Sequence, residues 1–262
     1  MVGLWRRPAK MSNRTLIFIP TYDERENAPV MCREIFQLNL NADVLFMDDS
    51  SPDRTVEALR ALQSDYPRLL VQCRASKLGI GSAHLDGIQW AYENGYQTLV
   101  TLDCDFTHAP SDISAMIAAT GSVAVSVGSR WLRKESLPGW NIFRRSMTIF
   151  GHVLTRCVLG LPYDASGAFR AYRLDRIPRE MFSLVSSKGY PFFFESLFIL
   201  HKNQISIREV PIILPARTYG NSKMTTLAAI RSACFVFELA FRNLVRPKRY
   251  LLSPDPGDSS AE

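Results

Sequence analysis

Short runs of apolar residues alternate along the first half of the chain with longer stretches in which apolar residues recur at every third or fourth position. Unbroken apolar runs of about five residues are typical of strands that are buried on both faces of a parallel sheet. The pattern therefore predicts buried strands over five runs: residues 15–19, 43–47, 69–73, 96–102 and 123–127.

Helix signals lie between these runs. Pro29 is tolerated in the first turn of a helix that begins near Asn27. Asp53 is expected to cap a helix that continues to Leu62, with Glu57 near its first turn. Two further helices are predicted over residues 83–93 and 111–120. Strands joined by helices imply right-handed crossovers, so we predict an α/β fold with a mainly parallel central sheet and flanking helices.

Polar segments follow four of the predicted strands, at the carboxyl ends where a sheet of this kind binds its ligands. These segments are residues 20–23, 48–49, 77–81 and 103–105. Asp103 and Asp105 can present oxygens to one hard divalent cation, which usually keeps several waters and bridges to substrate phosphates. We interpret this edge as a nucleotide-phosphate site. Taken alone, the aspartate pair also fits a solvated turn, and Asp48 and Asp49 also fit a helix cap.

Composition and charge narrow the range of partners. A chain of 262 residues that is 47% apolar fits one large α/β domain with a proper core. Its net charge of +6 favours anionic partners, namely phosphates, nucleic acid or an acidic membrane surface. The basic residues are dispersed, with no run of five or more, and we therefore expect no nucleic-acid partner.

The cysteines and the two ends of the chain indicate the cellular location of the protein. Five widely spaced cysteines without a C-x-x-C pair are interpreted as reduced thiols of a cytosolic protein, mostly small core residues, with no structural zinc. Residues 1–13 are basic but lack the apolar stretch of a secretory signal, so we expect a flexible arm. Residues 251–262 are expected to form a disordered tail. No segment approaches the roughly eighteen apolar residues of a membrane span.

The second half of the chain, residues 128–223, is more basic and is interpreted as an acceptor side of the same domain. Residues 224–250 predict an amphipathic helix followed by a basic cluster. Two interpretations of this helix stay open: packing on the catalytic domain, or resting on a membrane or a membrane-anchoring subunit. Its polar strip holds Arg231, Glu238 and Arg242. Its apolar residues at helical spacing are Leu227, Ile230, Cys234, Phe237, Phe241 and Leu244.

Seven motifs in consistent order and spacing resemble those of the family-2 inverting glycosyltransferases, which have the GT-A fold. They resemble most closely those of the dolichyl-phosphate or polyprenyl-phosphate mannosyltransferases, from about Thr15 to Phe241. The motifs are residues 20–27, 48–53, 77–81, 103–105, 128–130, 166–170 and 217–223. The resemblance implies a GT-A catalytic domain over residues 14–223, with a nucleotide-sugar half at 14–127 and an acceptor half at 128–223.

The resemblance implies a metal-dependent transfer of a hexose, foremost mannose from GDP-mannose, to a polyprenyl or dolichyl phosphate. Asp103, Asp105 and Thr107 would hold Mg²⁺ or Mn²⁺, while His108 is interpreted as a structural residue that orients the turn. Thr107 stands where the family often has Gln or Ser and is a weaker ligand, so UDP-sugar donors remain an alternative. The expected donor-binding residues are Pro20, Tyr22, Glu24, Asp49, Asp103 and, as a clamp on the diphosphate in a closing loop, Arg217 and Lys223.

The acceptor phosphate is assigned by the resemblance to Arg130 and Arg144, with Ser166 beside them, because guanidinium forks bind phosphate in a bidentate manner. Arg145 is interpreted as a solvated neighbour. A phosphate is anionic near neutral pH and needs no strong base. The alternative, a sugar-hydroxyl acceptor in polysaccharide or lipid-linked glycan synthesis, would need a carboxylate base; the late candidate is Glu195, although its apolar flank also suits a buried helix. A lipid-linked acceptor predicts a cytoplasmic protein, peripheral on the cytoplasmic face of a membrane.

Overall fold

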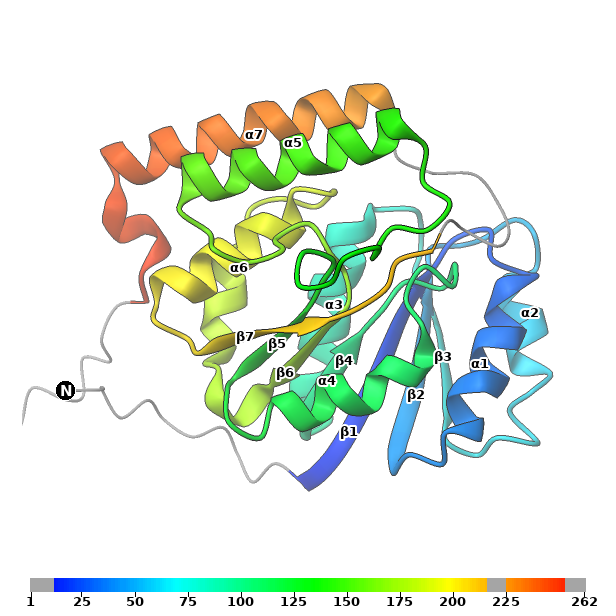
Figure 1. Cartoon of the computed structure of the whole chain (residues 1–262). Coiled ribbons are helices and arrows are strands. Elements are labelled where there is room, and N and C mark those ends of the chain that lie inside the picture. The colour runs from blue at the N-terminus through cyan, green and yellow to red at the C-terminus, as the bar shows by residue number, and fades with distance from the viewer. Residues whose placement is uncertain (1–11, 216–224, 253–262) are drawn as a thin grey trace, which may run out of the picture.

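A seven-stranded sheet forms the centre of the protein, seen in a computed structural model that describes residues 12–215 and 225–252 (Figure 1). The strand order is β3-β2-β1-β4-β6-β5-β7. Only β6 runs antiparallel to its neighbours in this sheet, which confirms the mainly parallel α/β fold. The strands are β1 Ser12–Thr21, β2 Ala42–Asp48, β3 Leu69–Cys73, β4 Tyr96–Thr101, β5 Val125–Ser129, β6 Arg170–Arg173 and β7 Ile207–Pro211.

Helices cover both faces of the sheet, and α5 and α7 lie side by side as an outer layer (Figure 1). Residues of α1, α2 and α4 contribute to one hydrophobic cluster, whereas residues of α3, α6 and α7 contribute to the other. The α-helices are α1 Asn27–Gln37, α2 Thr55–Arg60, α3 Ile80–Glu93, α4 Ile113–Ala119, α5 Ile142–Leu159, α6 Phe192–Lys202 and α7 Thr226–Val245. Short 3₁₀ helices lie at Pro110–Asp112, Leu174–Arg176, Arg179–Leu184 and Pro247–Tyr250.

The apolar run of β1 explains why the central strands lack alternation. Leu16 and Phe18 belong to one hydrophobic cluster, and Ile17 and Ile19 belong to the cluster on the opposite face. Successive side chains of a strand point to opposite faces, so a strand with a core on each side is apolar throughout. The approach of α3 to this strand is close, because a Cβ on Gly87 would lie 2.4 Å from the Phe18 ring.

The second helix differs from the prediction. It begins at Thr55 and ends at Arg60, with Arg54 in the left-handed conformation (φ 67°) at the N-cap position. Asp53 lies one residue earlier, where its Oδ1 accepts hydrogen bonds from the N–H and hydroxyl of Thr55 and its Oδ2 accepts one from the N–H of Arg25. Burial acts to raise the pKa of Asp53, but these hydrogen bonds outweigh it and lower the pKa. Asp53 thus joins the turn after β2 to the segment after β1.

Both predicted chain ends need correction where they meet the described residues. Strand β1 already includes Ser12 and Asn13, which were assigned to the arm; residues 1–11 lie outside the described part. At the other end, the N–H of Leu252 donates to Asn203 Oδ1 at 2.9 Å, so the chain is fixed beyond residue 250. Residues 253–262 lie outside the described part.

The cysteines are free thiols, but most of them are not core residues. Cys32 and Cys104 are buried, and burial raises the pKa of Cys32 to about 12. Cys73, Cys157 and Cys234 are exposed, so the expectation of core positions was wrong for these three. They lie at the end of β3 and on the outer helices α5 and α7, where no further layer covers them.

The predicted C-terminal helix is confirmed as α7. It packs on the domain through Val236 and Leu239, which are buried, while much of its apolar surface stays exposed. No helix within residues 12–215 and 225–252 is long and apolar enough to cross a membrane.

Candidate functional site

Four parallel strands end at one edge of the sheet and position the predicted donor site. Thr21 at the end of β1 pairs with Asp48 at the end of β2, which pairs with Cys73 at the end of β3. Strand β4 is in register with β1, with Thr101 opposite Phe18, so the segment that follows β4 emerges at the same edge. The sheet therefore gathers the four polar segments that the sequence placed at strand ends.

Asp48 is a structural member of the aspartate pair after β2. It is fully buried and accepts hydrogen bonds from the Thr21 hydroxyl (2.9 Å) and from the N–H (2.7 Å) and hydroxyl (2.6 Å) of Ser51. These contacts fix the end of β1 against the turn after β2. Neighbouring Asp49 lies in the same turn and is also buried.

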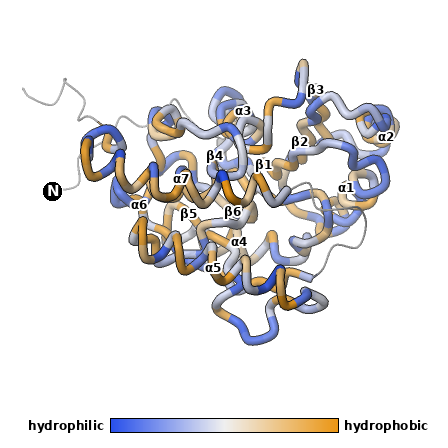
Figure 2. Tube along the Cα trace, turned by 90° about the horizontal axis from the view of Figure 1, so that it is seen from above, coloured by the Kyte–Doolittle hydropathy of each residue, from blue (hydrophilic) through white to orange (hydrophobic). Residues whose placement is uncertain are grey.

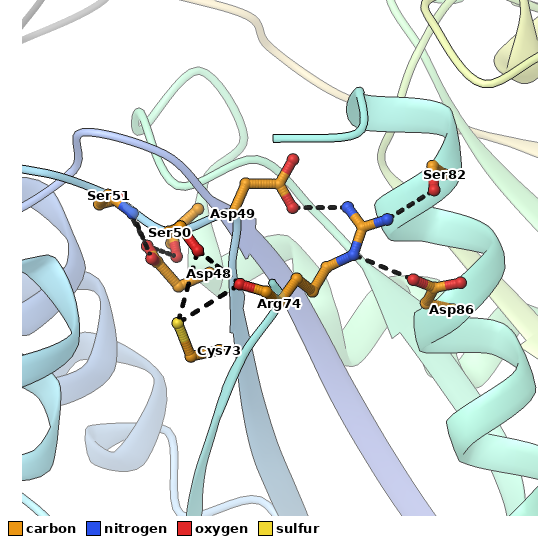
Figure 3. A network of polar contacts seen from close by, with 9 residues as sticks. Asp48, Asp49, Ser50, Ser51, Cys73, Arg74, Ser82 and Asp86 are labelled. Atoms are coloured by element: carbon orange, nitrogen blue, oxygen red, sulfur yellow. Dashed lines mark hydrogen bonds and ion pairs between the residues drawn. The ribbon is translucent and has the colours of Figure 1, made fainter. Parts of the chain in front are cut away.

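Asp49 forms a buried ion pair with Arg74, a residue that the sequence analysis missed. Arg74 Nη1 lies 2.5 Å from Asp49 Oδ1, and their side chains are only 7% and 8% exposed. The other nitrogens reach helix α3: Nη2 donates to Ser82 Oγ (2.5 Å) and Nε to Asp86 Oδ2 (2.9 Å). Figure 3 shows the guanidinium between the end of β2 and α3. Arg74 thus fixes the carboxylate that the resemblance assigns to the nucleoside.

The other predicted nucleoside residues follow β1. The Lys77 ammonium lies 3.6 Å from the centroid of the Tyr22 ring, a cation–π contact that joins the segment after β1 to the segment after β3. Glu24 Oε2 accepts a hydrogen bond from the Asn27 side chain at 2.7 Å, at the start of α1. Pro20 is buried within β1 itself. The structure therefore brings these positions to the same edge as Asp49.

The turn after β4 holds two carboxylates in a defined arrangement. Asp105 Oδ1 accepts hydrogen bonds from the N–H (3.1 Å) and hydroxyl (2.5 Å) of Thr107, while Phe106 between them has a left-handed φ of 59°. The N–H of Asp103 donates to Nδ1 of buried His108 at 3.1 Å. This hydrogen bond holds the backbone of the turn at Asp103, as expected of a histidine that orients the turn.

The donor set of this turn fits a hard divalent cation. Asp103, whose side chain is 36% exposed, and Asp105 supply carboxylate oxygens, which Mg²⁺ and Mn²⁺ prefer. Among the described residues, no three or more His, Cys, Asp or Glu side chains gather into a metal site. The remaining ligands of an ion here would be water and diphosphate oxygens. The Thr107 hydroxyl is engaged in supporting Asp105, and its role as a direct ligand stays a prediction.

Arg130 follows β5 and is held by Asp164, a second residue that the sequence analysis missed. Asp164 Oδ2 accepts hydrogen bonds from Nε (2.7 Å) and the backbone N–H (3.2 Å) of Arg130, and both side chains are buried. Its Oδ1 accepts one from the Ser166 hydroxyl at 3.3 Å. A Cβ on Gly167 would lie 3.5 Å from Arg130 Nη2, so the guanidinium lies close to the backbone of Gly167. Asp164 therefore brings two predicted acceptor residues together.

Strand β6 separates the aspartate turn from Arg130. Arg170 in β6 pairs with Thr101 of β4 on one side and with Val127 of β5 on the other. Both neighbours are antiparallel to β6, so they run in the same direction and end at the same edge, two strand spacings or about 10 Å apart. Asp103 lies two residues beyond Thr101, and Arg130 lies three beyond Val127. The predicted metal and acceptor-phosphate residues thus follow strands that end at the same edge of the sheet.

A basic pocket of about 670 Å³ opens beside Arg130. Arg145 lines it, although the sequence analysis set this residue aside as a solvated neighbour. Arg144 is not among the lining residues; its guanidinium lies 3.8 Å from the centroid of the Trp140 ring. The lining residues are Arg130, Trp131, Arg133, Lys134, Glu135, Ser136, Leu137, Pro138, Arg145 and Ile149.

Glu195, the candidate base for a hydroxyl acceptor, is buried in α6. It accepts four hydrogen bonds, 2.5 to 3.0 Å long, from the N–H and hydroxyl groups of Ser186 and Ser187. A general base must come within hydrogen-bond reach of the proton it removes. Its burial and full set of partners therefore favour the buried-helix interpretation over the catalytic one.

The missed residues share a sequence signal. Arg74 directly follows β3, Asp164 lies two residues before the motif at residues 166–170, and each of these charged side chains pairs with a predicted site residue. Arg217 and Lys223, the predicted clamp on the diphosphate, lie outside the described residues.

Sequence comparison finds similar enzymes over most of the chain. Residues 16–177 match glycosyl transferase family 2. The chain is 35% identical to the polyprenol monophosphomannose synthase of Mycolicibacterium smegmatis over 227 residues, covering 86% of this chain and 85% of that protein. It is 32% identical to the undecaprenyl-phosphate mannosyltransferase of Micrococcus luteus over 213 residues, covering 81% of this chain and 88% of that protein.

Solved structures share the fold at low sequence identity. The mannosyl-3-phosphoglycerate synthase of Rubrobacter xylanophilus superposes with a TM-score of 0.61 over 95% of this chain and 80% of that chain, at 15% identity. A mannosyltransferase from Pyrobaculum calidifontis, solved with GDP-mannose and Mn²⁺, superposes with a TM-score of 0.55 over 92% of this chain and 68% of that chain, also at 15% identity. These similarities establish the GT-A fold.

Proposed function

The chain belongs to glycosyl transferase family 2, and we propose that it transfers mannose from GDP-mannose to a polyprenyl phosphate with inversion at the anomeric carbon. The observation that carries this proposal is that Asp103 and Arg130 follow β4 and β5, two strands that end at one edge of the sheet about 10 Å apart with β6 between them. A donor diphosphate and an acceptor phosphate can then lie on either side of one sugar. The names of both curated relatives describe mannose transfer to a polyprenyl acceptor.

On the donor side, Asp49 is the residue proposed to recognise the nucleobase. Arg74 holds its Oδ1, and a carboxylate in a fixed orientation accepts hydrogen bonds from the N–H groups at the edge of a guanine. Tyr22 and Glu24 follow the neighbouring strand and are proposed to contact the base and ribose. Arg217 and Lys223 are proposed to clamp the diphosphate.

Asp103 and Asp105 are proposed to hold Mg²⁺ or Mn²⁺. Such an ion, when bound, neutralises the negative charge that develops on the leaving diphosphate. The chain prepares this arrangement in advance, because Thr107 fixes the carboxylate of Asp105 and His108 fixes the backbone at Asp103. Preorganised groups need no reorganisation during the reaction.

On the acceptor side, Arg130 and Arg144 are proposed to bind the phosphate, with Ser166 next to them and Arg145 in the adjoining pocket. An acceptor phosphate oxygen attacks the anomeric carbon while the bond from that carbon to the donor diphosphate breaks. The attacking oxygen is already anionic, so no base has to remove a proton. The burial of Glu195 supports this choice over a sugar-hydroxyl acceptor.

A lipid acceptor places the enzyme at a membrane surface. We propose a peripheral position on the cytoplasmic face, with α7 contacting the bilayer or a membrane-anchoring subunit. Support comes from the exposed apolar side chains of α7 and from the basic residues that follow it, Arg246, Lys248 and Arg249.

A substrate panel tests the proposed reaction. The full chain is incubated with radiolabelled GDP-mannose, GDP-glucose, UDP-glucose or UDP-GlcNAc, each with polyprenyl phosphates or with the corresponding polyprenols. We expect label to enter a lipid product with GDP-mannose and a polyprenyl phosphate. Transfer to a sugar hydroxyl instead, or a preference for a UDP-sugar, would overturn the proposal.

The first prediction concerns Asp105. Replacing it by Asn removes a metal-binding charge, and we expect turnover to fall about a hundredfold or more. A chelator should reproduce the loss in the native chain, and added Mg²⁺ or Mn²⁺ should reverse it. The control is Asp65→Asn at an exposed site, with circular dichroism to check the fold. Undiminished activity of Asp105→Asn in chelator would remove the aspartate pair from the mechanism.

The second prediction concerns the acceptor arginines. Loss of a charge-assisted phosphate contact costs about 1.5–3 kcal/mol, so Arg144→Ala and Arg145→Ala should each raise the KM for polyprenyl phosphate about tenfold or more. For Arg130, Lys is the better replacement, because it leaves a positive charge beside buried Asp164 while removing the guanidinium fork. The KM for GDP-mannose should change little.

Arg60→Ala, at an exposed site on α2, serves as the matched control for these arginine variants. Equal losses of donor and acceptor affinity would show that the arginines act on the fold and not on the acceptor.

A further inference from the structure

Arg170, the last residue of the motif at residues 166–170, carries a buried charge that the proposed function does not use. Three arginines are buried among the described residues, namely Arg74, Arg130 and Arg170. The first two pair with carboxylates, whereas no Asp or Glu of the described residues lies within ion-pair distance of Arg170, which is 0% exposed. A buried cation is costly unless polar groups surround it, so the groups around this guanidinium indicate its role.

Neutral groups surround this guanidinium in place of a carboxylate. Its Nε donates to the carbonyl of Gly167 (3.0 Å), and its Nη2 donates to the carbonyls of Ala165 (3.1 Å) and Phe193 (2.6 Å). Its Nη1 donates to the hydroxyl of Ser196 at 3.1 Å. Because all four acceptors are neutral, the side chain keeps its full positive charge while it fixes two peptide groups of the loop before β6.

These contacts set the direction of two backbone N–H groups. A trans peptide points its C=O and its N–H to opposite sides. The carbonyls of Ala165 and Gly167 point to Arg170, so the N–H groups that follow them, on Ser166 and Ala168, point away from it. Neither N–H donates a hydrogen bond to a described residue, although Ala168 is buried. A buried N–H without a partner is costly, so these two donors are suited to a ligand.

The loop that carries the two donors lies between the proposed metal and acceptor residues. Strand β6 is antiparallel to β4 and β5, so it begins at the edge where both neighbours end; Figure 2 shows β6 near the centre of the molecule in a view from above. The Thr101 hydroxyl at the end of β4 donates to the Ala168 carbonyl at 2.6 Å. On the other side, a Cβ on Gly167 would lie 3.5 Å from Arg130 Nη2. The donors are therefore close to the guanidinium that is proposed to bind the acceptor phosphate.

We propose that the N–H groups of Ser166 and Ala168 bind the phosphate of the polyprenyl acceptor together with Arg130, and that Arg170 is the positioning residue that orients them. Backbone N–H groups that point to the same side bind phosphate oxygens in many proteins. An anion at this place also gains from the positive charge behind the two peptide groups. A mannose hydroxyl is the poorer ligand, because it has no charge to complement Arg170. The inference rests on the proposed function and adds a binding site to it.

Binding of farnesyl phosphate to the full chain, without donor, tests the role of Arg170. Isothermal titration calorimetry gives the Kd, and farnesol serves as the ligand that lacks the phosphate. In Arg170→Lys one ammonium replaces three donor nitrogens, so the loop loses support and we expect the Kd to rise about tenfold. The Kd for GDP-mannose should change little. Arg173→Lys, in the same strand but paired with Asp175, is the matched control.

An ester bond in the backbone tests the N–H group itself, also in case Arg170→Lys does not fold. Lactic acid in place of Ala168 exchanges the N–H for an oxygen and keeps the methyl side chain, and we expect the Kd for farnesyl phosphate to rise about tenfold. This ester also weakens the Gly167 carbonyl as an acceptor. The control is therefore an ester between Phe193 and Phe194, which weakens another carbonyl that Arg170 holds and should bind farnesyl phosphate like the native chain.

Three results would overturn the inference alone. They are an unchanged Kd for farnesyl phosphate in the Ala168 ester, equal losses in both esters, and a loss of GDP-mannose affinity in place of farnesyl phosphate affinity. A native chain that bound farnesyl phosphate no better than farnesol would contradict the proposed acceptor itself, and the inference with it.

Discussion

Buried partners hold the charged side chains on both sides of the site. Asp49 pairs with Arg74 on the donor side, and Arg130 pairs with Asp164 on the acceptor side. A charge that is removed from water without a partner costs several kcal/mol, so each pair satisfies a requirement of burial. The same contacts restrict the carboxylate and the guanidinium to one orientation. The residues proposed to contact substrate are in this way positioned by residues that are not proposed to contact it.

Arg74→Lys tests this relation on the donor side. The lysine keeps a positive charge for Asp49, but its single ammonium cannot reach Asp49, Ser82 and Asp86 as the three guanidinium nitrogens do. We expect the KM for GDP-mannose to rise about tenfold, since one hydrogen bond to a charged group is worth about 1.5–3 kcal/mol. The KM for polyprenyl phosphate should stay constant in steady-state kinetics.

Arg68→Lys, near the opposite end of β3 and exposed, is the matched control. An unchanged donor KM for Arg74→Lys would show that the network serves the fold alone.

At the scale of elements, helix α6 supports the glycine-containing turn at residues 77–81. Glu195 in α6 holds Ser186 and Ser187, and the next residue, Lys188, accepts a hydrogen bond from the Ser82 N–H at 3.0 Å. A Cβ on Gly79, which has a φ of 98°, would lie 2.6 Å from the Lys188 carbonyl oxygen. Only glycine fits this contact, so the turn at residues 77–81 packs closely against the loop before α6.

Glu195→Gln should therefore act on stability. The amide nitrogen of Gln cannot accept the hydrogen bonds that one carboxylate oxygen now accepts, and we expect a loss of about 3 kcal/mol in the free energy of unfolding. Urea denaturation measures this loss, with Glu57→Gln at an exposed site as the control. At low temperature the folded variant should retain turnover. Full stability combined with lost turnover would return Glu195 to the role of a catalytic base.

At the scale of the whole molecule, His84 lies within the core that joins β1, α3 and α6. Its ring packs against those of Phe18, Phe192 and Phe193, and its Nε2 has no hydrogen-bond partner among the described residues. Burial, with smaller contributions from the charges of Arg170 and His108, lowers the pKa of His84 to about 3. The folded protein therefore keeps this side chain neutral in mildly acidic solution.

This gives a prediction for the dependence of stability on pH. The unfolded chain binds a proton at His84 below a pKa of 6.5, whereas the folded chain does not until about pH 3. The unfolded state thus binds more protons in this window, and His84 lowers the free energy of unfolding by about 1.4 kcal/mol per pH unit as the pH falls from 6.5 towards 3. Above pH 6.5, His84 does not make the free energy of unfolding depend on pH.

Urea denaturation of the native chain and of His84→Leu at several pH values isolates this effect. As the pH falls, the free energy of unfolding should decrease more for the native chain than for the variant. Parallel pH profiles would show that the ring takes up a proton in the folded state.

The sequence alone determined five of the seven strands, β1 to β5, because a strand with a core on each face is apolar throughout, as β1 is. Strands β6 and β7 were not predicted. It also placed Asp49 and Asp103 at strand ends, since chain order and parallel pairing bring those ends to one edge. The position of Arg130 at the same edge depends on the antiparallel strand β6.

Only the tertiary structure decided which charges pair and which surfaces stay uncovered. Arg74 lies 25 residues from Asp49, and Arg130 lies 34 from Asp164, so no local pattern records these contacts. The sequence likewise gave no indication that the apolar residues of α5 are exposed, and it left open whether Glu195 is buried or catalytic. An apolar stripe forms a core when another layer covers it and a surface when none does, and a carboxylate is buried only where donors surround it. Both outcomes depend on neighbours that come from distant parts of the chain.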